Sequence, residues 1–277
     1  LLDLNDIKQT LKYLQTDEGE AEISKEYGKV SVSTIGVILR KIIELEEQGA
    51  GEFFGEPSFE VNDLLHTQDG MGIIHILRLM NMNTKPKLFS TFMLALLAEI
   101  YSTFPEEGDM DKPKLMVFID EAHLLFDEAS KALLDQIEQI VKLIRSKGVG
   151  IIFCTQNPID IPDDVLAQLG LKVQHALRAF TAKDRDAIRK ASENYPETDF
   201  YKVEDLITEL GIGEAFVTAL SEKGTPTPLV HTMIAPPRSR MDTITDEEFN
   251  KVVESSGISD KYQDVENRDS AYEKLCK

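Results

Sequence analysis

One seven-residue stretch constrains the fold of this chain more than any other. Five apolar residues, Leu115–Ile119, run directly into two adjacent carboxylates, Asp120 and Glu121. An apolar run without polar alternation is typical of a strand that is buried on both faces, as in a parallel sheet. We therefore predict an α/β fold in which the two acids follow a central strand.

The end of that strand is where we expect chemistry, because ligands of open α/β sheets bind beyond the carboxyl ends of the strands. Asp120 is suited to hold Mg²⁺ through its water shell, and Glu121 to accept a proton from a water that attacks a phosphate. The pattern is typical of a Walker B motif with a catalytic glutamate. The alternative is an apolar strand that ends in a solvated acidic turn.

A helix and a second strand follow. Residues 129–147 carry an apolar face at three- and four-residue spacing, and Gly148 supplies the stop. The next apolar run, which includes Cys154, predicts a second buried strand that ends at Thr155 and Gln156. Strand, helix and strand in this order predict a right-handed parallel crossover, which brings Gln156 to the same sheet edge as Glu121. An amide there can bond both a water and a γ-phosphate, as a sensor does, although turn formation also explains Gln156.

The segment from Phe118 to Asp184 resembles the HerA-type ATPases, which are relatives of the FtsK-like DNA translocases. The resemblance extends from about the first helix to Arg240. It implies a RecA-like P-loop NTPase core with a mostly parallel central sheet and hydrolysis of ATP with Mg²⁺. It also implies DNA translocation by a ring, usually a hexamer, that holds DNA in its channel. A nuclease is a candidate partner.

The resemblance also implies a role for single residues. Asp120 and Glu121 match the Walker B pair, with Asp120 as the ligand of the metal and the cofactor, and Gln156 matches the polar sensor. Arg145 lies where related rings carry a candidate arginine finger that reaches into the neighbouring subunit's site. A cation in the last helical turn is the alternative reading of Arg145. Arg178, at a strand end, is a secondary candidate for contacting nucleotide across a subunit boundary.

The chain departs from this family in one large respect, because it contains no G-x-x-x-x-G-K-S/T motif. Its single Gly-Lys step is Gly28-Lys29, and Val30 follows. Such a loop supplies the backbone N–H groups and the lysine that hold the phosphates. In the family this loop lies nearer the N-terminus, and the chain begins with Leu1. We therefore expect the C-terminal portion of a longer protein, with ATPase activity only in the full-length parent and weak or no nucleotide binding here.

Two other functions compete with the ring ATPase. Asp120-Glu121-Ala122-His123 also spells the DEAH box of two-lobed helicases, but the strand end and the arginine-rich motif of those enzymes do not follow. A non-catalytic regulatory or assembly module of an NTPase fold stays open, and the upstream reading frame discriminates it from the enzyme. His123 has no partner at metal-ligand spacing, so a structural role is favoured over metal binding.

The chain divides into three predicted parts. Residues 1–70 form a helical segment packed on the core, residues 71–235 form the ATPase core, and residues 236–277 form a C-terminal tail or a neighbour-clasping arm. Helices are predicted over 2–49 and 87–104, and from Ala182 after a Thr181 cap. Thr245 and Glu248 predict a capping box for a further helix. Strands are predicted at 72–77 and 173–180, with a β-hairpin over 214–220 and 228–234.

Composition sets outer limits on function. The net charge of −19 argues against a broadly basic nucleic-acid surface, although a ring can keep basic loops in its pore while its exterior is acidic. Two distant cysteines form no disulfide framework, so a reducing cytoplasm is expected. No apolar stretch approaches membrane-spanning length, and no membrane partner is expected.

Overall fold

The computed structural model describes residues 3–79, 84–108, 110–127, 129–266 and 268–276. The chain folds as two compact units, one formed by Leu1–Phe104 together with Ile244–Lys277 and the other by Pro105–Thr243. Helices and strands occur in both units, and one strand pair is parallel, so the predicted α/β class is confirmed. Among the described helices, none is both long enough and apolar enough to cross a bilayer.

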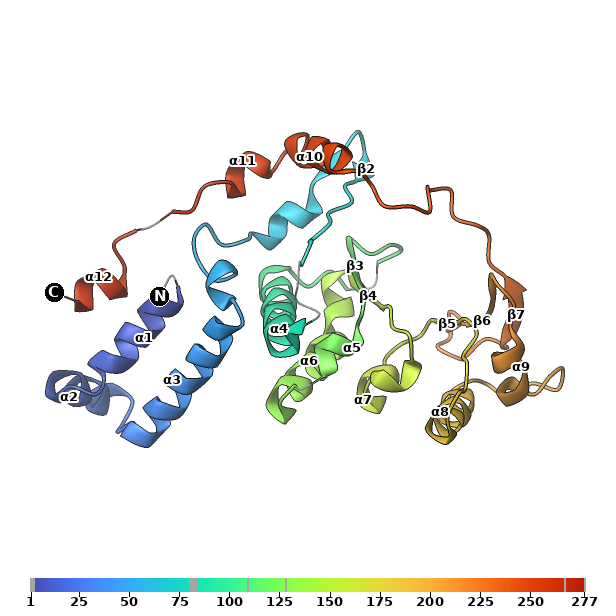
Figure 1. The fold of residues 1–277 in the computed structure, drawn as a ribbon, viewed down its shortest axis with the longest axis horizontal. Helices are drawn as coiled ribbons and strands as arrows, with labels where there is room; N and C mark the ends of the chain where they lie inside the picture. The colour runs from blue at the N-terminus through green and yellow to red at the C-terminus, as the bar shows by residue number, and fades with distance from the viewer. Residues whose placement is uncertain (1–2, 80–83, 109, 128, 267, 277) are drawn as a thin grey trace. The chain divides into compact units, whose positions relative to one another are not determined.

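The first unit is mostly helical (Figure 1), and its helices include those predicted within residues 2–49 and over 87–104. The first three helices each begin with a side-chain cap, because Asp3, Thr16 and Ser31 each accept a hydrogen bond from a backbone N–H of the first turn. The helices and 3₁₀ turns before the second unit include α1 (Leu4–Tyr13), α2 (Asp17–Glu26), α3 (Val32–Glu47), η1 (Ala50–Glu52), η2 (Val61–Leu65) and α4 (Pro86–Thr103).

The C-terminal segment belongs to this first unit. Its helices are α10 (Asp246–Glu254), α11 (Ser259–Tyr262) and α12 (Ala271–Leu275), and the predicted capping box of Thr245 and Glu248 is present at α10. Figure 1 shows α12 beside α1. The buried carboxylate of Asp6 on α1 accepts hydrogen bonds from Ser270 Oγ and, at 2.7 Å, from the Tyr272 N–H. These bonds fasten the end of the described chain to its first helix.

The strand predicted over 72–77 is wrong. Only Met71–Gly72 forms a strand, β2, which pairs with β1 (Thr67–Gln68) in a short antiparallel hairpin. Residues 73–79 lie outside any strand, and Ile74 is 88% exposed. A strand requires a neighbour for its backbone groups, and no described residue pairs with this run. The apolar pattern indicated a local preference for a strand, but the described residues provide no neighbouring strand to pair with it.

The second unit contains the parallel pair that the sequence predicts. β3 (Leu115–Ile119) and β4 (Val149–Phe153) run parallel, with Leu115 opposite Val149 at one end and Ile119 opposite Phe153 at the other. The connection between them consists of α5 (His123–Phe126), α6 (Lys131–Leu143) and the 3₁₀ turn η4 (Ile144–Lys147). Gly148 follows with φ of +71°, so the predicted helix stop is confirmed.

The prediction that both faces of these strands are buried is wrong. Successive side chains of a strand point to opposite faces, and along β3 Phe118 is 66% exposed whereas Ile119 is buried. Among the described residues β3 and β4 form a sheet of two strands, and one face of β3 is left uncovered. Cys154 lies just beyond β4 and is exposed, so it is not the buried strand residue that was predicted.

A second sheet follows in the same unit, with the antiparallel order β5-β6-β7. The predicted hairpin is confirmed as β6 and β7, and Phe216 on β6 is buried among Ile188, Ile207, Leu210 and Leu229. The elements after β4 are the 3₁₀ turn η5 (Pro158–Asp160), α7 (Asp163–Leu166), β5 (Lys172–Gln174), α8 (Ala182–Glu193), α9 (Val203–Glu209), β6 (Glu214–Thr218) and β7 (Val230–Met233).

The strand predicted over 173–180 is shorter in the structure, where β5 ends at Gln174. Beyond it the Leu177 N–H donates to the carbonyl of Ile207 at 3.1 Å, at the end of α9. The backbone of Leu177 therefore bonds to α9 and not to a neighbouring strand. The helix predicted after Thr181 is confirmed, because Thr181 and Asp184 form a capping box at the start of α8.

Candidate active site

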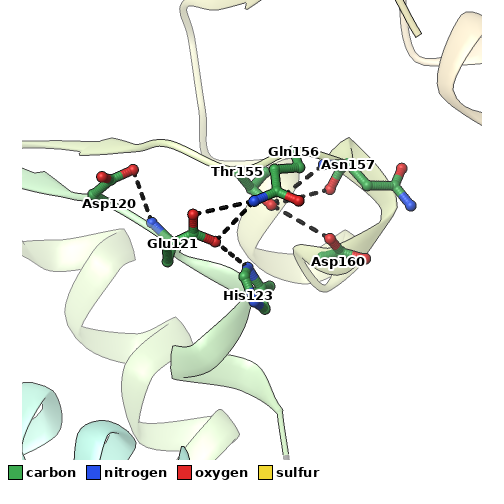
Figure 2. Close-up of polar contacts among 7 residues, drawn as sticks. All are labelled: Asp120, Glu121, His123, Thr155, Gln156, Asn157 and Asp160. Atoms are coloured by element: carbon green, nitrogen blue, oxygen red, sulfur yellow. Dashed lines mark hydrogen bonds and ion pairs between the residues drawn. The ribbon is translucent and has the colours of Figure 1, made fainter. Parts of the chain in front are cut away.

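Glu121 and Gln156 meet at one edge of the parallel pair. Glu121 follows β3 and Gln156 follows β4, and parallel strands in register end at the same edge. The Gln156 Nε2 donates to Glu121 Oε1 at 3.1 Å and lies 3.3 Å from Oε2 (Figure 2). The acid and the amide that the sequence predicted at a common sheet edge are therefore hydrogen-bonded to each other.

The backbone of Glu121 adopts a left-handed conformation, with φ of +50°. A residue with a Cβ pays roughly 1–3 kcal/mol for such a conformation, and it persists where neighbouring bonds hold it. Here Asp120 Oδ1 accepts a hydrogen bond from the Glu121 N–H at 3.0 Å, and the Ala122 N–H donates to the carbonyl of Cys154 at 2.9 Å. The turn that presents the carboxylate is thus tied to both strands.

His123 also faces Glu121, although a structural role was favoured for it from the sequence. It is the first residue of α5, and its Nδ1 lies 3.3 Å from Glu121 Oε2 (Figure 2). That nitrogen is buried, and no described residue forms a hydrogen bond with it. The signal that could have identified this contact is that His123 lies only two positions after Glu121 in the sequence.

The loop after β4 is fixed by its own side chains. Thr155 Oγ1 donates to Asp160 Oδ2 at 3.4 Å, and Asn157 Oδ1 accepts from the Ile159 N–H at 3.4 Å to cap η5. The segment therefore forms a turn, and the side chain of Gln156 is directed at Glu121. The turn holds the amide in place.

The charges of this site define what it can bind. The seven residues drawn in Figure 2 include the carboxylates of Asp120, Glu121 and Asp160 and no lysine or arginine. A nucleotide triphosphate needs positive charge beside such a set. The exposed carboxylate of Asp120 is a hard oxygen donor of the kind that Mg²⁺ prefers. The donor chemistry therefore fits a magnesium nucleotide better than a bare anion.

A protein cage for a metal is not what the described residues form. They contain no group of three or more histidine, cysteine, aspartate or glutamate side chains arranged to hold an ion. Magnesium sites commonly take only one or two carboxylates and complete their shell with waters and substrate phosphates. A single carboxylate such as Asp120 suits that second type of site.

Cys154 lies beside these acids, directly after β4. Although the residue as a whole is exposed, partial desolvation of its sulfur and the negative charge of Asp120 raise the pKa of its thiol. The thiol therefore stays protonated at neutral pH and is a poor metal ligand or nucleophile.

Arg145 lies at the other end of the strand pair from Gln156. It belongs to η4, which precedes β4, whereas Gln156 follows β4. A strand of five residues spans roughly 16 Å. Within one chain, Arg145 and the Glu121–Gln156 pair therefore occupy opposite edges of the sheet.

Arg178 holds the end of α9. Its guanidinium donates to the carbonyl of Thr208 and, at 3.0 Å, to the carbonyl of Leu210. These bonds give Arg178 a structural contact within the second unit. A contact with nucleotide across a subunit boundary stays a prediction.

Comparison with known proteins shows which family this chain matches. The family model described as "Helicase HerA-like C-terminal" matches residues 1–277. A "Probable helicase" of Methanocaldococcus jannaschii is 33% identical over 129 residues, which cover 45% of this chain and 23% of that protein. The "DNA double-strand break repair helicase HerA" of Pyrococcus furiosus is 29% identical over 129 residues, which cover 46% of this chain and 22% of that protein. The match spans less than a quarter of these relatives' length.

Two solved structures illustrate the structural likeness. VirB4 of Thermoanaerobacter pseudethanolicus is 19% identical with a TM-score of 0.47, over 80% of this chain and 54% of that one. The genome packaging NTPase B204 of Sulfolobus turreted icosahedral virus 2, in complex with AMPPCP, is 14% identical with a TM-score of 0.39, over 79% of this chain and 93% of that one. Both superpositions are too loose to assign a function.

Proposed function

This chain belongs to the family described as Helicase HerA-like C-terminal, and we propose that it carries part of the ATP hydrolysis site of a ring-forming DNA translocase. The observation that supports the proposal most strongly is the hydrogen bond between Glu121 and Gln156 at the carboxyl edge of the parallel pair. The names of two relatives, a probable helicase and a DNA double-strand break repair helicase, suggest DNA as the polymer that is moved.

Each residue of the pair has a defined task in this proposal. Glu121 accepts a proton from the water that attacks the γ-phosphate, as a general base does. Gln156 orients the Glu121 carboxylate and senses the γ-phosphate through its amide. Asp120 is the residue that would hold Mg²⁺. When bound, Mg²⁺ neutralises negative charge on the triphosphate, which the three carboxylates of this site would otherwise repel.

The remaining positive charge is proposed to come from a neighbouring subunit. Arg145 lies at the sheet edge away from its own Glu121, so it would serve as an arginine finger for the next site around a hexameric ring. Arg178 is the secondary candidate for the same boundary, with its contacts to α9 fixing its position.

ATP hydrolysis by the full-length protein, measured with and without DNA and with the oligomer mass determined in the same buffer, tests the proposal. We expect Mg²⁺-dependent hydrolysis that DNA stimulates, together with the mass of a closed ring. A full-length protein that assembles and binds DNA but never hydrolyses ATP would exclude the enzyme.

A second candidate is a non-catalytic regulatory or assembly module. The observation that favours this module is that the 277-residue sequence contains no G-x-x-x-x-G-K-S/T motif. The reading frame upstream of this sequence separates the two candidates. The motif after an upstream strand supports the enzyme, whereas its absence from the whole reading frame supports the module.

A further inference from the structure

The His123 ring has a buried nitrogen that the described structure leaves without a hydrogen bond. The Nδ1 atom is inaccessible to solvent, whereas 27% of the side chain as a whole stays exposed. A buried polar atom without a partner destabilises the fold, so such an atom needs an explanation. The polar atom that faces it is Glu121 Oε2, at 3.3 Å (Figure 2).

The backbone between Glu121 and Leu124 sets the position of the His123 ring relative to the Glu121 carboxylate. Glu121 has a positive φ, the Ala122 N–H is bonded to the carbonyl of Cys154, and the Leu124 N–H donates to the carbonyl of Glu121 at 2.9 Å. His123 opens α5 directly after this turn, and Leu125 in the same helix is fully buried. The turn therefore carries the imidazole to one side of the carboxylate while Gln156 occupies another.

We propose that His123 is a positioning residue that holds the carboxylate of Glu121, with its Nδ1–H donating to Oε2. The inference rests on the proposed function, because the direction of this carboxylate matters only if Glu121 activates water. An ionised carboxylate has about four lone-pair sites. It can therefore accept from Gln156 and from His123 and still accept the proton of a water. Two donors on separate elements fix the direction in which the remaining lone pairs point.

Amide variants of His123 in the full-length protein test this role. His123→Asn carries its amide nitrogen near the place of Nδ1, and His123→Gln carries it near the place of Nε2. His123→Leu removes both nitrogens at similar volume. We expect kcat to fall by about tenfold or more in the Leu and Gln variants with KM little changed, because a misdirected base slows chemistry without weakening binding. The Asn variant should recover most of kcat.

The tautomer of His123 gives a readout that does not depend on turnover. In the ¹⁵N spectrum of the full-length protein, Nδ1 of His123 should carry the proton in the wild type. It should lose that preference in Glu121→Ala, because the acceptor is gone. A proton that stays on Nε2 in both proteins would overturn the inference.

The outcomes of this experiment separate the inference from the proposed function. If the wild type hydrolyses ATP and all three His123 variants keep its kcat, the positioning role is overturned and the proposed function stands. If the Asn variant is as slow as the Leu and Gln variants, with unchanged melting temperatures, His123 only fills space and the inference is overturned. If the wild type does not hydrolyse ATP at all, both fail together.

Discussion

The position of Glu121 could be predicted from the sequence, whereas its backbone conformation could not. Its place after an apolar strand is a pattern in the sequence, and so is the place of Gln156 after the next strand. Parallel pairing then makes their meeting predictable. The left-handed backbone of Glu121 was not predictable, because such conformations are signalled by glycine or asparagine and a glutamate gives no local sign.

The strain at Glu121 predicts an unusual order of stability. Glu121→Gly and Glu121→Ala both lose the carboxylate, but only glycine adopts a positive φ without cost. We expect the glycine variant to match or exceed the alanine variant in free energy of unfolding, by up to about 1 kcal/mol. Urea denaturation of both variants measures the difference.

Gln136, an exposed residue in the middle of α6, provides the matched control. At this position the alanine variant should exceed the glycine variant in free energy of unfolding by about 1 kcal/mol, as in an ordinary helix. If alanine exceeds glycine equally at both positions, the backbone of Glu121 is not strained.

At the scale of elements, local signals predicted helices and caps well and strands less well. The cap at Thr181 and the capping box at Thr245 were readable because the groups that form them lie within one turn. The strand at 72–77 and the length of β5 failed because a strand depends on a distant partner. The predicted burial of both faces of β3 was wrong for the same reason, since other parts of the fold determine whether each face is covered.

The bond between Asp6 and α12 predicts that one side chain secures the tail. Asp6→Ala removes the acceptor of Ser270 Oγ and of the Tyr272 N–H. We expect faster amide hydrogen exchange over residues 271–275, with local opening favoured by about 1–3 kcal/mol. Asp6→Asn keeps an acceptor oxygen and should retain more protection. Equal protection in the wild type and Asp6→Ala would contradict the role of Asp6.

The contact of α11 with η2 should be sensitive to acid. Hydrogen bonds from Lys261 (2.8 Å) and from the Tyr262 hydroxyl lower the pKa of the buried Asp63 carboxyl. A pKa that is lower in the folded than in the unfolded chain stabilises the fold above the ordinary aspartate pKa of about 3.9. This stabilisation is lost as the pH falls through the lowered, folded-state value.

Protection of residues 259–262 against hydrogen exchange, corrected for the intrinsic rate at each pH, measures this effect. We expect protection to be constant from pH 7 to 5 and to fall at lower pH. In Asp63→Asn it should be low throughout. A wild-type profile with no fall in acid would show that Asp63 does not hold α11.

At the scale of the whole molecule, the site is acidic in an acidic chain. The chain carries a net charge of −19, and three of the residues drawn in Figure 2, Asp120, Glu121 and Asp160, are acids. The sequence could predict the acids and the amide of one subunit. It could not predict which surfaces meet in an assembly, because the contacts between subunits leave no local periodicity in one chain.

The position of Arg145 predicts complementation between subunits. Arg145→Ala and Glu121→Gln should each abolish hydrolysis alone in the full-length protein. Mixed rings should recover some hydrolysis, because an intact Arg145 from one subunit can face an intact Glu121 in the next. Native mass spectrometry confirms that mixed rings have formed. Mixed rings without any recovered activity would exclude Arg145 as a finger in trans.

The fate of a single bound ATP in the full-length protein tests the central claim most directly. Labelled ATP is mixed with excess protein and Mg²⁺, and the bound nucleotide is analysed over time in the wild type and in Glu121→Gln. We predict that the wild type converts it to ADP, whereas Glu121→Gln retains intact ATP at similar affinity, with conversion slowed by about 10²–10⁴-fold. Conversion at the wild-type rate in Glu121→Gln would contradict the assignment of this site.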